Sequence, residues 1–569
     1  MRRNFVLASL FLLLMVGCEK KGGVVDLADY LETYSMGDDA TLAFHRALDD
    51  CRERGASTLI IPEGTYNLYP DYAYERYQYV TNNDASLKRI LLDLVEMEDF
   101  EIRGENAVLM LHGYMSPISI TRCENITISG IHIDYDRTFH TEGKVMAVGD
   151  GYLDVYISED FPHTFKDGKL RFCDALGNEY PSRHMLEFDA MRREPAFRAQ
   201  DSWINGNVPM EDLGNDVYRV YTWATATPGN IMVFGADHRL CPAIVIDHST
   251  GVLLHDLDIW HAGGMGVVGQ FATDVELNKV RVVPSPGKNR VISVTADATH
   301  FVHGGGYLRL IDCEFFNQTD DASNIHGYYC PVKKVLSDDR LLVAFAHEQQ
   351  EGQDVFELGS RVEFQPQNSL IPYAECTVTE ITPLNCKYFV ITLEGDLSQV
   401  KEGDLLCRER GPEVLIKGCR LGNNRARGFL LGSRLSTTIE DCWFHSSGAS
   451  IFFEGDGLYW YEQAGPRNVV IRGNTFENCM YGGPWGSAPI SSGGGPRSDR
   501  LECAYNRNIL IENNHFILSD PRVLDVFSID SCVFRNNKIE FSDVYPKDPA
   551  VQNRQMFITN DCSRTHIEQ

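Results

Sequence analysis

Residues 416–421 read IKGCRL, and residues 439–444, 23 positions later, read IEDCWF. Two further pairs share this offset: LHDLDI at 254–259 with LNKVRV at 277–282, and IENNHF at 511–516 with FRNNKI at 534–539. Self-similarity at a fixed period is the sequence signature of a solenoid. We therefore predict that one structural coil repeats every 23 residues over much of the chain.

Each of these six-residue units has an apolar residue at its first and sixth positions, and four of the six also have one at the fourth, where the last pair has asparagine. A small or polar residue precedes the fourth position, a pattern typical of strand, tight turn and second strand rather than helix. Stacked coils place like residues in ladders about 4.8 Å apart. The fold class predicted is all-β, a right-handed parallel β-helix. An antiparallel β-sandwich would explain the alternation but not the fixed period.

The beginning of the chain fits a capped solenoid. Residues 39–48 form an amphipathic helical pattern with an aspartate at its start, and a strand and turn, TLIIPEGTY, follow at 58–66. Solenoids need a cap over their open end. The helix followed by this strand resembles the first segment of pectate-lyase-like and polygalacturonase-like β-helices.

Two stretches interrupt the period, and we interpret them as inserted, small β-barrel-like domains. Both show alternating strands but no coil unit, for example at 152–157 and 388–393. The predicted organisation is a lipoprotein signal peptide at 1–17, an anchor and linker at 18–23, a cap and first coils at 24–136, an inserted β domain at 137–240, central coils at 241–329, a second inserted β domain at 330–412, and final coils at 413–569.

The composition limits the possible partners. With 80 acidic and 52 basic residues, the 569-residue chain has a net charge of −28. Such a surface repels nucleic acid and anionic membranes, so we expect no nucleic-acid partner. The charge also disfavours polyanionic sugars, and a neutral glycan is the easier ligand.

The first residues predict export. Arg2 and Arg3 precede an apolar run at 5–16 that is too short to span a bilayer. MVGC at 15–18 resembles a bacterial lipoprotein cleavage box, which would place a lipid anchor on Cys18. The expected location is the cell-envelope membrane, with the lipid as the only membrane contact; an ordinary secretory signal or an uncleaved anchor is the alternative.

The 16 cysteines show no Cys-x-x-Cys spacing, which argues against a structural zinc site. Cys313, Cys419 and Cys442 occupy the fourth, inward-facing position of their coil units. We expect them, and most other cysteines, to be free thiols that pack as small apolar side chains.

Asp297 and the pair Asp320-Asp321 carry the strongest functional signal. They are 23 residues apart, so the period stacks Asp297 against the pair on the next coil. Neighbouring carboxylates cannot all ionise easily, and one with a raised pKa can act as a general acid while an ionised neighbour activates water. This arrangement suits cleavage of a glycosidic bond. A surface aspartate corner or a calcium site would explain the same residues.

The Asp, Asp-Asp arrangement on a β-helix resembles that of the polygalacturonase clan. The lipoprotein-like start, the two insertions, and the segments TADATHFVHGGG (295–306) and NQTDDASNIHG (317–327) together resemble glycoside hydrolase family 110. These are bacterial exo-acting α-1,3-galactosidases, some of which cleave the blood group B determinant. The Gly-His-Gly and Arg-Ile-Lys motifs of polygalacturonases are not evident here.

The resemblance implies that Asp320 is the general acid, that Asp297 and Asp321 activate water, and that the anomeric configuration is inverted. It implies no metal and no other cofactor. The implied partners are neutral, galactose-terminated oligosaccharides or glycoconjugates. Further candidates for substrate binding are Trp260, His261, His300, His303, Asn324, His326, Arg427, Glu454 and Trp460.

Several of these candidates have simpler explanations. The His300-x-x-His303 spacing would also suit a metal, Trp260 would equally be a packing residue, and Arg427 an ordinary surface arginine. For the whole protein, a β-helix polysaccharide lyase or epimerase and a non-catalytic glycan-binding β-helix remain alternatives, because a fold alone does not decide function.

Overall fold

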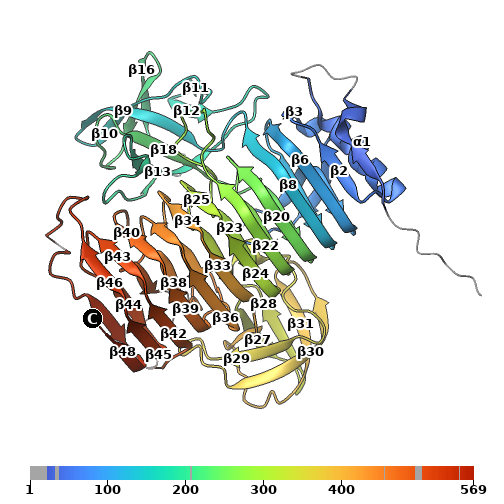
Figure 1. Cartoon of the computed structure of the whole chain (residues 1–569), viewed down its shortest axis with the longest axis vertical. Helices are drawn as coiled ribbons and strands as arrows, with labels where there is room; N and C mark the ends of the chain where they lie inside the picture. Colours follow the sequence, from blue (N-terminus) through green and yellow to red (C-terminus); the bar gives the residue numbers. More distant parts are fainter. Residues whose placement is uncertain are drawn as a thin grey trace, which may run out of the picture.

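A computed structural model describes residues 22–31, 38–204, 208–453, 455–493, 503–549 and 551–568. Its main body is a stack of parallel coils built from a 20-stranded and a 12-stranded sheet (Figure 1). The predicted right-handed parallel β-helix is confirmed, with both insertions present as separate β structures.

The register of the larger sheet follows the sequence period. β33 (Glu413–Lys417) pairs with β36 (Ser436–Glu440) so that Ile416 lies opposite Ile439. The turn after β33 is made by Gly418, whose φ of 66° is a left-handed conformation that favours glycine. The predicted sequence of strand, tight turn and second strand is therefore correct for this coil.

The 12-stranded sheet carries the candidate site where two of its strands begin. In spatial order its strands are β4 (Tyr74–Gln78), β5 (Ser86–Val95), β7 (Ser116–Thr121), β19 (Ile244–Asp247), β21 (Val267–Gln270), β23 (Thr299–Val302), β26 (Ser323–His326), β35 (Phe429–Leu431), β38 (Ile451–Phe453), β41 (Ile490–Ser492), β44 (Leu524–Phe527) and β47 (Phe557–Asn560). All neighbours after β5 pair in parallel.

The core of the solenoid consists of ladders of like side chains. Phe444, Phe476 and Phe516 are fully buried, and their rings stack with successive centroid distances of 4.7 and 4.6 Å. The cysteines at 313, 419 and 442 form a second ladder and are at most 2% exposed. Every cysteine among the described residues is a free thiol, and most are buried, as the sequence predicted.

A helix covers the N-terminal end of the coils. α1 runs over Thr41–Arg54, six residues further than the amphipathic pattern at 39–48 indicated. The Asp39 carboxylate accepts a hydrogen bond from the backbone N–H of Thr41 at 2.8 Å and so satisfies one free donor of the first turn. Phe44 and Leu48 pack into the core, which closes the open end of the solenoid.

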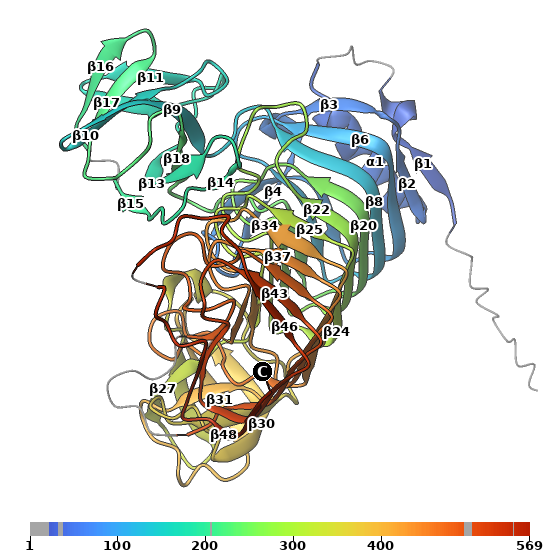
Figure 2. The same cartoon turned by 60° about the vertical axis from the view of Figure 1, so that its left-hand side comes forward.

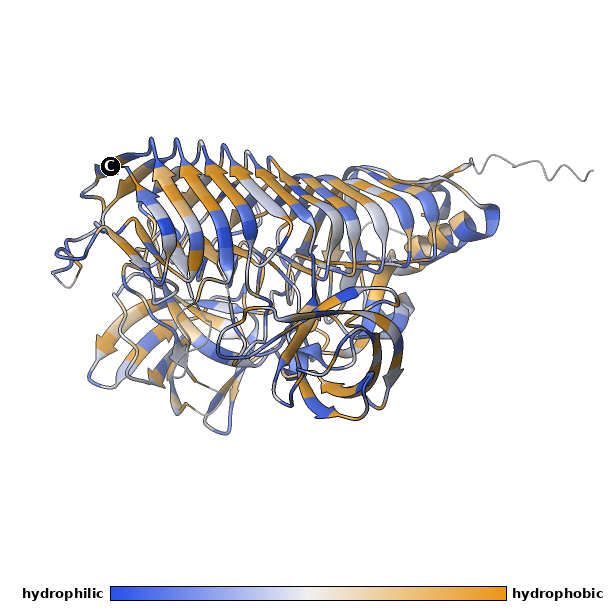
Figure 3. Cartoon of the chain, turned by 90° about the horizontal axis from the view of Figure 1, so that it is seen from below, coloured by the Kyte–Doolittle hydropathy of each residue, from blue (hydrophilic) through white to orange (hydrophobic). Residues whose placement is uncertain are grey.

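The two insertions project from the same side of the solenoid (Figures 2 and 3). The first contains an eight-stranded antiparallel sheet whose longest members are β9 (Thr141–Gly149), β13 (Ser182–Asp189) and β18 (Ile231–Ala236). The second is a closed barrel of β27 (Cys330–Val335), β28 (Arg340–Ala344), β29 (Arg361–Gln365), β30 (Ala374–Pro383), β31 (Tyr388–Glu394) and β32 (Leu405–Arg408).

The predicted signal peptide, the lipobox and Cys18 lie outside the described residues. Within the described part of the chain, no helix is long and apolar enough to cross a membrane.

Candidate active site

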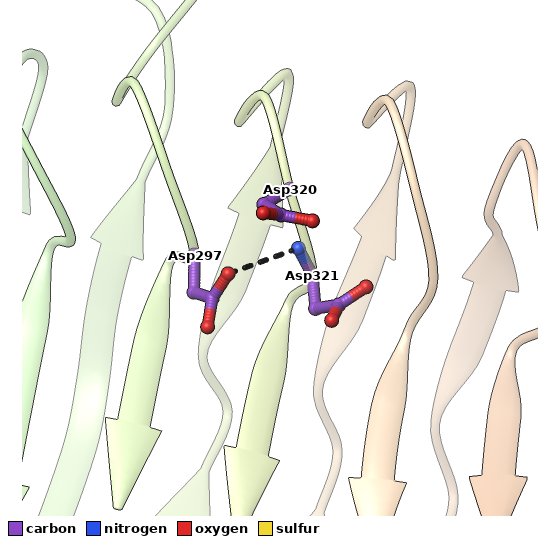
Figure 4. Close-up of side chains that lie close together, drawn as sticks. All are labelled: Asp297, Asp320 and Asp321. Atoms are coloured by element: carbon purple, nitrogen blue, oxygen red, sulfur yellow. Dashed lines mark hydrogen bonds between the residues drawn. The ribbon is translucent and has the colours of Figure 1, made fainter. Parts of the chain in front are cut away.

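The three predicted catalytic aspartates lie together on neighbouring coils (Figure 4). Asp297 precedes β23, and Asp320 and Asp321 precede β26. One carboxylate oxygen from each residue lies within 4.8 Å of the other two. Thr299 pairs with Ser323, so Asp321 is level with Asp297 and Asp320 lies one residue further out. The local offset is thus 24 residues, one more than the period.

The three carboxylates differ in exposure. Asp297 and Asp321 are each 3% exposed, and the backbone N–H of Asp321 donates a hydrogen bond of 3.4 Å to Asp297 Oδ1. The Asp320 side chain is 18% exposed. Asp320 is therefore the member of the cluster most accessible from solvent.

Three arginines surround the carboxylates. Arg427 binds Asp321 through its side chain, with Nε 3.1 Å from Oδ1 and Nη2 3.0 Å from Oδ2. Arg239 Nη2 donates to Asp320 Oδ2 at 2.7 Å, and Arg425 Nη1 lies 3.5 Å from Asp320 Oδ1. Such charge-assisted contacts both orient a carboxylate and favour its ionised form.

Burial and charge push the three pKa values in different directions. Burial raises the pKa of Asp297 to about 8, and the charge of Asp320 adds to this effect. Burial also raises the pKa of Asp321 to about 7, against the opposing charge of Arg427. Burial acts upward on Asp320 too, but the neighbouring guanidinium groups outweigh it and lower its pKa. This arrangement favours the protonated form of Asp297 at neutral pH and that of Asp321 only below about pH 7, while it favours the ionised form of Asp320.

A buried polar chain supports the cluster from one side. His300 Nδ1 lies 2.7 Å from Asp297 Oδ2, and His300 Nε2 lies 3.0 Å from His326 Nε2. His326 Nε2 lies 3.6 Å from Glu462 Oε1, and Asn324 Nδ2 donates to Glu462 Oε2 at 3.0 Å. Burial lowers the pKa of His300 to about 4, so this imidazole is neutral at neutral pH. The chain thus holds the Asp297 carboxyl group in one orientation.

A cluster of three carboxylates could in principle bind a divalent cation. The contacts favour another interpretation, because the oxygens of Asp320 and Asp321 already face the guanidinium groups of Arg239, Arg425 and Arg427. A cation would have to replace these contacts or be repelled by them.

The structure brings four of the predicted substrate-binding residues next to the aspartates: His300, Asn324, His326 and Arg427. Three others lie elsewhere. Trp260 stacks on His132 with ring centroids 4.9 Å apart, at the end of β20 (Thr250–Ile259) in the other sheet. His261 is fully buried, with Nε2 accepting from the Phe139 N–H and Nδ1 2.5 Å from the Ser293 carbonyl oxygen.

His303 follows the far end of β23 and stacks on Phe271 with ring centroids 5.0 Å apart. It accepts a hydrogen bond from the Tyr328 N–H at 3.3 Å. His261 and His303 are only 0% and 3% exposed. Both therefore serve packing and backbone hydrogen bonding.

Trp460 lies near the site but makes no contact with the aspartates. Its ring centroid lies 4.3 Å from that of His347 in the second insertion, and Trp460 itself belongs to the loop that also carries Glu462. Burial lowers the pKa of His347. Among the nearby charges, Glu462 raises this pKa and Arg239 lowers it. Glu454 lies outside the described residues.

Several residues of the site had no sequence motif to reveal them. Arg239, Arg425 and Glu462 are single charged residues in loops. The folding of distant segments brings both arginines against Asp320 and places Glu462 against His326. Arg425 had one usable signal, because it is two positions before Arg427 in the sequence NNRARG (423–428). The Trp485 ring lies 4.4 Å from the Arg425 guanidinium and supports that arginine.

Three family models match the chain: GLAA-B beta-barrel domain I at residues 141–232, GLAA-B beta-barrel domain II at 340–406, and the right-handed β-helix region at 414–545. An alpha-1,3-galactosidase A of Shewanella woodyi is 31% identical over 534 residues, which is 92% of this chain and 87% of that protein. The chain belongs to the α-1,3-galactosidase family, glycoside hydrolase family 110. It is a glycoside hydrolase.

Other members of the family are similar over the same length. An alpha-1,3-galactosidase A of Bacteroides fragilis is 28% identical and covers 92% of this chain and 88% of its own. An alpha-1,3-galactosidase B of Bacteroides thetaiotaomicron is 27% identical, with 93% and 88% coverage. Among solved structures, a family 28 exopolygalacturonase of Yersinia enterocolitica superposes with a TM-score of 0.43 at 11% identity, covering 96% and 79% of the two chains. A TM-score this low supports no functional comparison.

Proposed function

We propose that this protein is an exo-acting, inverting glycoside hydrolase that removes terminal α-1,3-linked galactose from neutral glycans. The blood group B determinant and linear Gal-α-1,3-Gal are the proposed substrates. The observation that carries the proposal is the group of three carboxylates within 4.8 Å, with pKa values driven in opposite directions. The names of the relatives, all α-1,3-galactosidases over most of their length, support the choice of sugar and linkage.

In the proposed mechanism Asp320 protonates the leaving oxygen, while Asp297 and Asp321 position and deprotonate the attacking water. The exposure of Asp320 suits contact with a leaving group, and the burial of the other two suits a small nucleophile. The proton distribution is opposite to these roles, because Arg239 and Arg425 keep Asp320 ionised. Under this proposal the incoming substrate must weaken the Arg239 contact so that a proton moves onto Asp320.

Variants of each aspartate can separate the roles. If Asp320 is the acid, Asp320→Asn loses roughly 10²- to 10⁴-fold in turnover of Gal-α-1,3-Gal but keeps most of its activity on an aryl α-galactoside whose leaving group needs no proton. Asp297→Asn and Asp321→Asn should lose activity on both substrates, and azide should restore turnover of the aryl substrate as β-galactosyl azide. The reverse pattern would assign the acid to Asp297 or Asp321.

The stereochemical part of the proposal rests on the family. Inverting enzymes usually separate acid and base by roughly 6.5–9.5 Å, whereas the nearest oxygens here lie within 4.8 Å. Proton NMR of the first products, with chelator present, tests both stereochemistry and activity. Free β-galactose appearing first is the expected result; α-galactose refutes inversion.

The same reaction tests the other interpretations of the fold. Unsaturated products that absorb in the ultraviolet, or activity abolished by the chelator, would indicate a lyase or a cation-dependent reaction. Glycan binding with no product over a long incubation would indicate a binding protein.

We also propose that the protein is exported and anchored by a lipid on Cys18. The basic start, the short apolar run and the MVGC sequence at 15–18 support this. Labelled palmitate should enter the full-length chain expressed in a bacterium and should be absent from a Cys18→Ala variant; equal labelling of the two would refute the anchor.

A further inference from the structure

One segment of the first insertion, around Asp201, contacts an arginine of the active site. Asp201 binds Arg425 through two hydrogen bonds, Nε to Oδ1 at 2.8 Å and Nη2 to Oδ2 at 2.5 Å, and both side chains are at most 9% exposed. Arg425 also contacts Asp320 and donates to the Thr319 carbonyl oxygen at 3.2 Å. This buried ion pair fixes the segment around Asp201 next to the proposed general acid.

Trp203 is two residues from that ion pair, so its Cα lies within about 7 Å of the Cα of Asp201. It belongs to the short strand β15 (Ser202–Trp203), in which it pairs with His184 of β13. The charges of Arg425, Asp201 and Asp320 all reach His184 and affect its pKa, which burial lowers to about 4. Trp203 therefore contacts a buried histidine whose pKa responds to the charges of Asp201, Arg425 and Asp320.

The Trp203 side chain is 54% exposed despite this position. Its ring contacts His184 with centroids 5.6 Å apart, and the Arg183 guanidinium lies 5.1 Å from the ring centre. Two neighbours thus hold the indole while about half of it stays open to solvent. Figure 2 shows β13 and β15 at the side of the first insertion that faces the loops of the solenoid.

A fixed, half-exposed aromatic ring with an adjacent donor suits a pyranose ring, which presents apolar C–H groups on its faces and hydroxyls at its edge. The terminal galactose must occupy the space at the aspartates, so a ring near Trp203 belongs to the remainder of the glycan. We propose that Trp203 is the stacking platform for the sugar on the leaving-group side, and that Arg183 hydrogen-bonds its hydroxyls. This inference rests on the proposed function.

The test compares substrates with and without that sugar. α-Galactosyl fluoride lacks it and Gal-α-1,3-Gal carries it. Trp203→Ala should leave kcat/KM for the fluoride within about twofold of wild type. It should raise KM for the disaccharide about tenfold, as expected from the loss of roughly 60 Å² of apolar contact. Trp203→Phe should recover most of the loss, because a ring remains. Tyr72→Ala, which removes an aromatic residue of 51% exposure in the cap, is the matched control and should change neither substrate.

Each outcome has one meaning. Equal kinetics of Trp203→Ala and wild type on the disaccharide would overturn the inference while leaving the proposed function intact. Trp223 is 84% exposed and follows Thr222, whose hydroxyl oxygen lies 3.4 Å from that of Ser202. A loss confined to Trp223→Ala would therefore move the platform to that residue and also overturn the inference. A wild-type protein that releases no galactose from either substrate refutes the proposed function and the inference together.

Discussion

Replacing Asp297 by asparagine should stabilise the protein increasingly as the pH rises from 5 to 7. The buried Asp297 carboxyl group keeps its proton until about pH 8, whereas in the unfolded chain it releases the proton near pH 3.8. Between pH 5 and 7 the folded state thus binds one more proton than the unfolded state at this position. Because unfolding then releases a proton, the contribution of Asp297 to the stability of the wild type falls as the pH increases.

The magnitude follows from the proton count. One proton bound only by the folded state changes the free energy of unfolding by about 1.4 kcal/mol per pH unit. Asparagine does not titrate, so the Asp297→Asn variant lacks this loss. Its free energy of unfolding should gain about 1.4 kcal/mol per pH unit relative to wild type, or roughly 3 kcal/mol from pH 5 to pH 7.

Urea denaturation of the chain from residue 19 onward, followed by tryptophan fluorescence at pH 5, 6 and 7, measures this difference. Asp530→Asn is the control, because hydrogen bonds from Arg564 and Ser563 lower the pKa of Asp530 and none of these residues contacts the aspartate cluster. Asp530 is ionised in both states over this range, so the effect of its replacement on stability should not change with pH. The reasoning is refuted if the Asp297→Asn difference is flat or decreases with pH, or if the two variants show the same slope.

Two predictions concern the scaffold. Gly130→Ala should lower the free energy of unfolding by about 2–4 kcal/mol, because the new Cβ would lie 2.0 Å from the Gly104 carbonyl oxygen at a φ of 66°. Gly177 also has a positive φ but open space around it, so Gly177→Ala should lose only the free energy of the strained backbone conformation. Equal losses for the two variants in urea denaturation would contradict this reasoning. Arg434→Met should cost about 3–5 kcal/mol, because it leaves the buried Glu363 carboxylate without its main partner. The double variant with Glu363→Leu should recover part of that loss, and a single variant as stable as wild type would show that the pair is dispensable.

The sequence alone determined the repeating architecture, because equivalent positions of successive β-helix coils need similar residues, so the coil length appears as a period in the sequence. Ile416 and Ile439 lie opposite each other since both are inward residues of stacked coils, and Gly418 marks the turn that follows Ile416 within its own coil. The same regularity brought Asp297 and the Asp320-Asp321 pair to neighbouring coils. Family-specific segments around these aspartates then indicated the chemistry before any side chain had been placed.

The tertiary structure alone decided how the aspartates are surrounded. Arg239, Arg425 and Glu462 come from loops whose paths no period describes, yet they determine which carboxyl group is ionised. The extra residue in the coil before β26 put Asp321, not Asp320, level with Asp297. The prediction that His261, next to Trp260, binds substrate was wrong, since the His261 side chain is buried. Local patterns report backbone repeats, whereas pKa values and exposure depend on contacts between segments far apart in the chain.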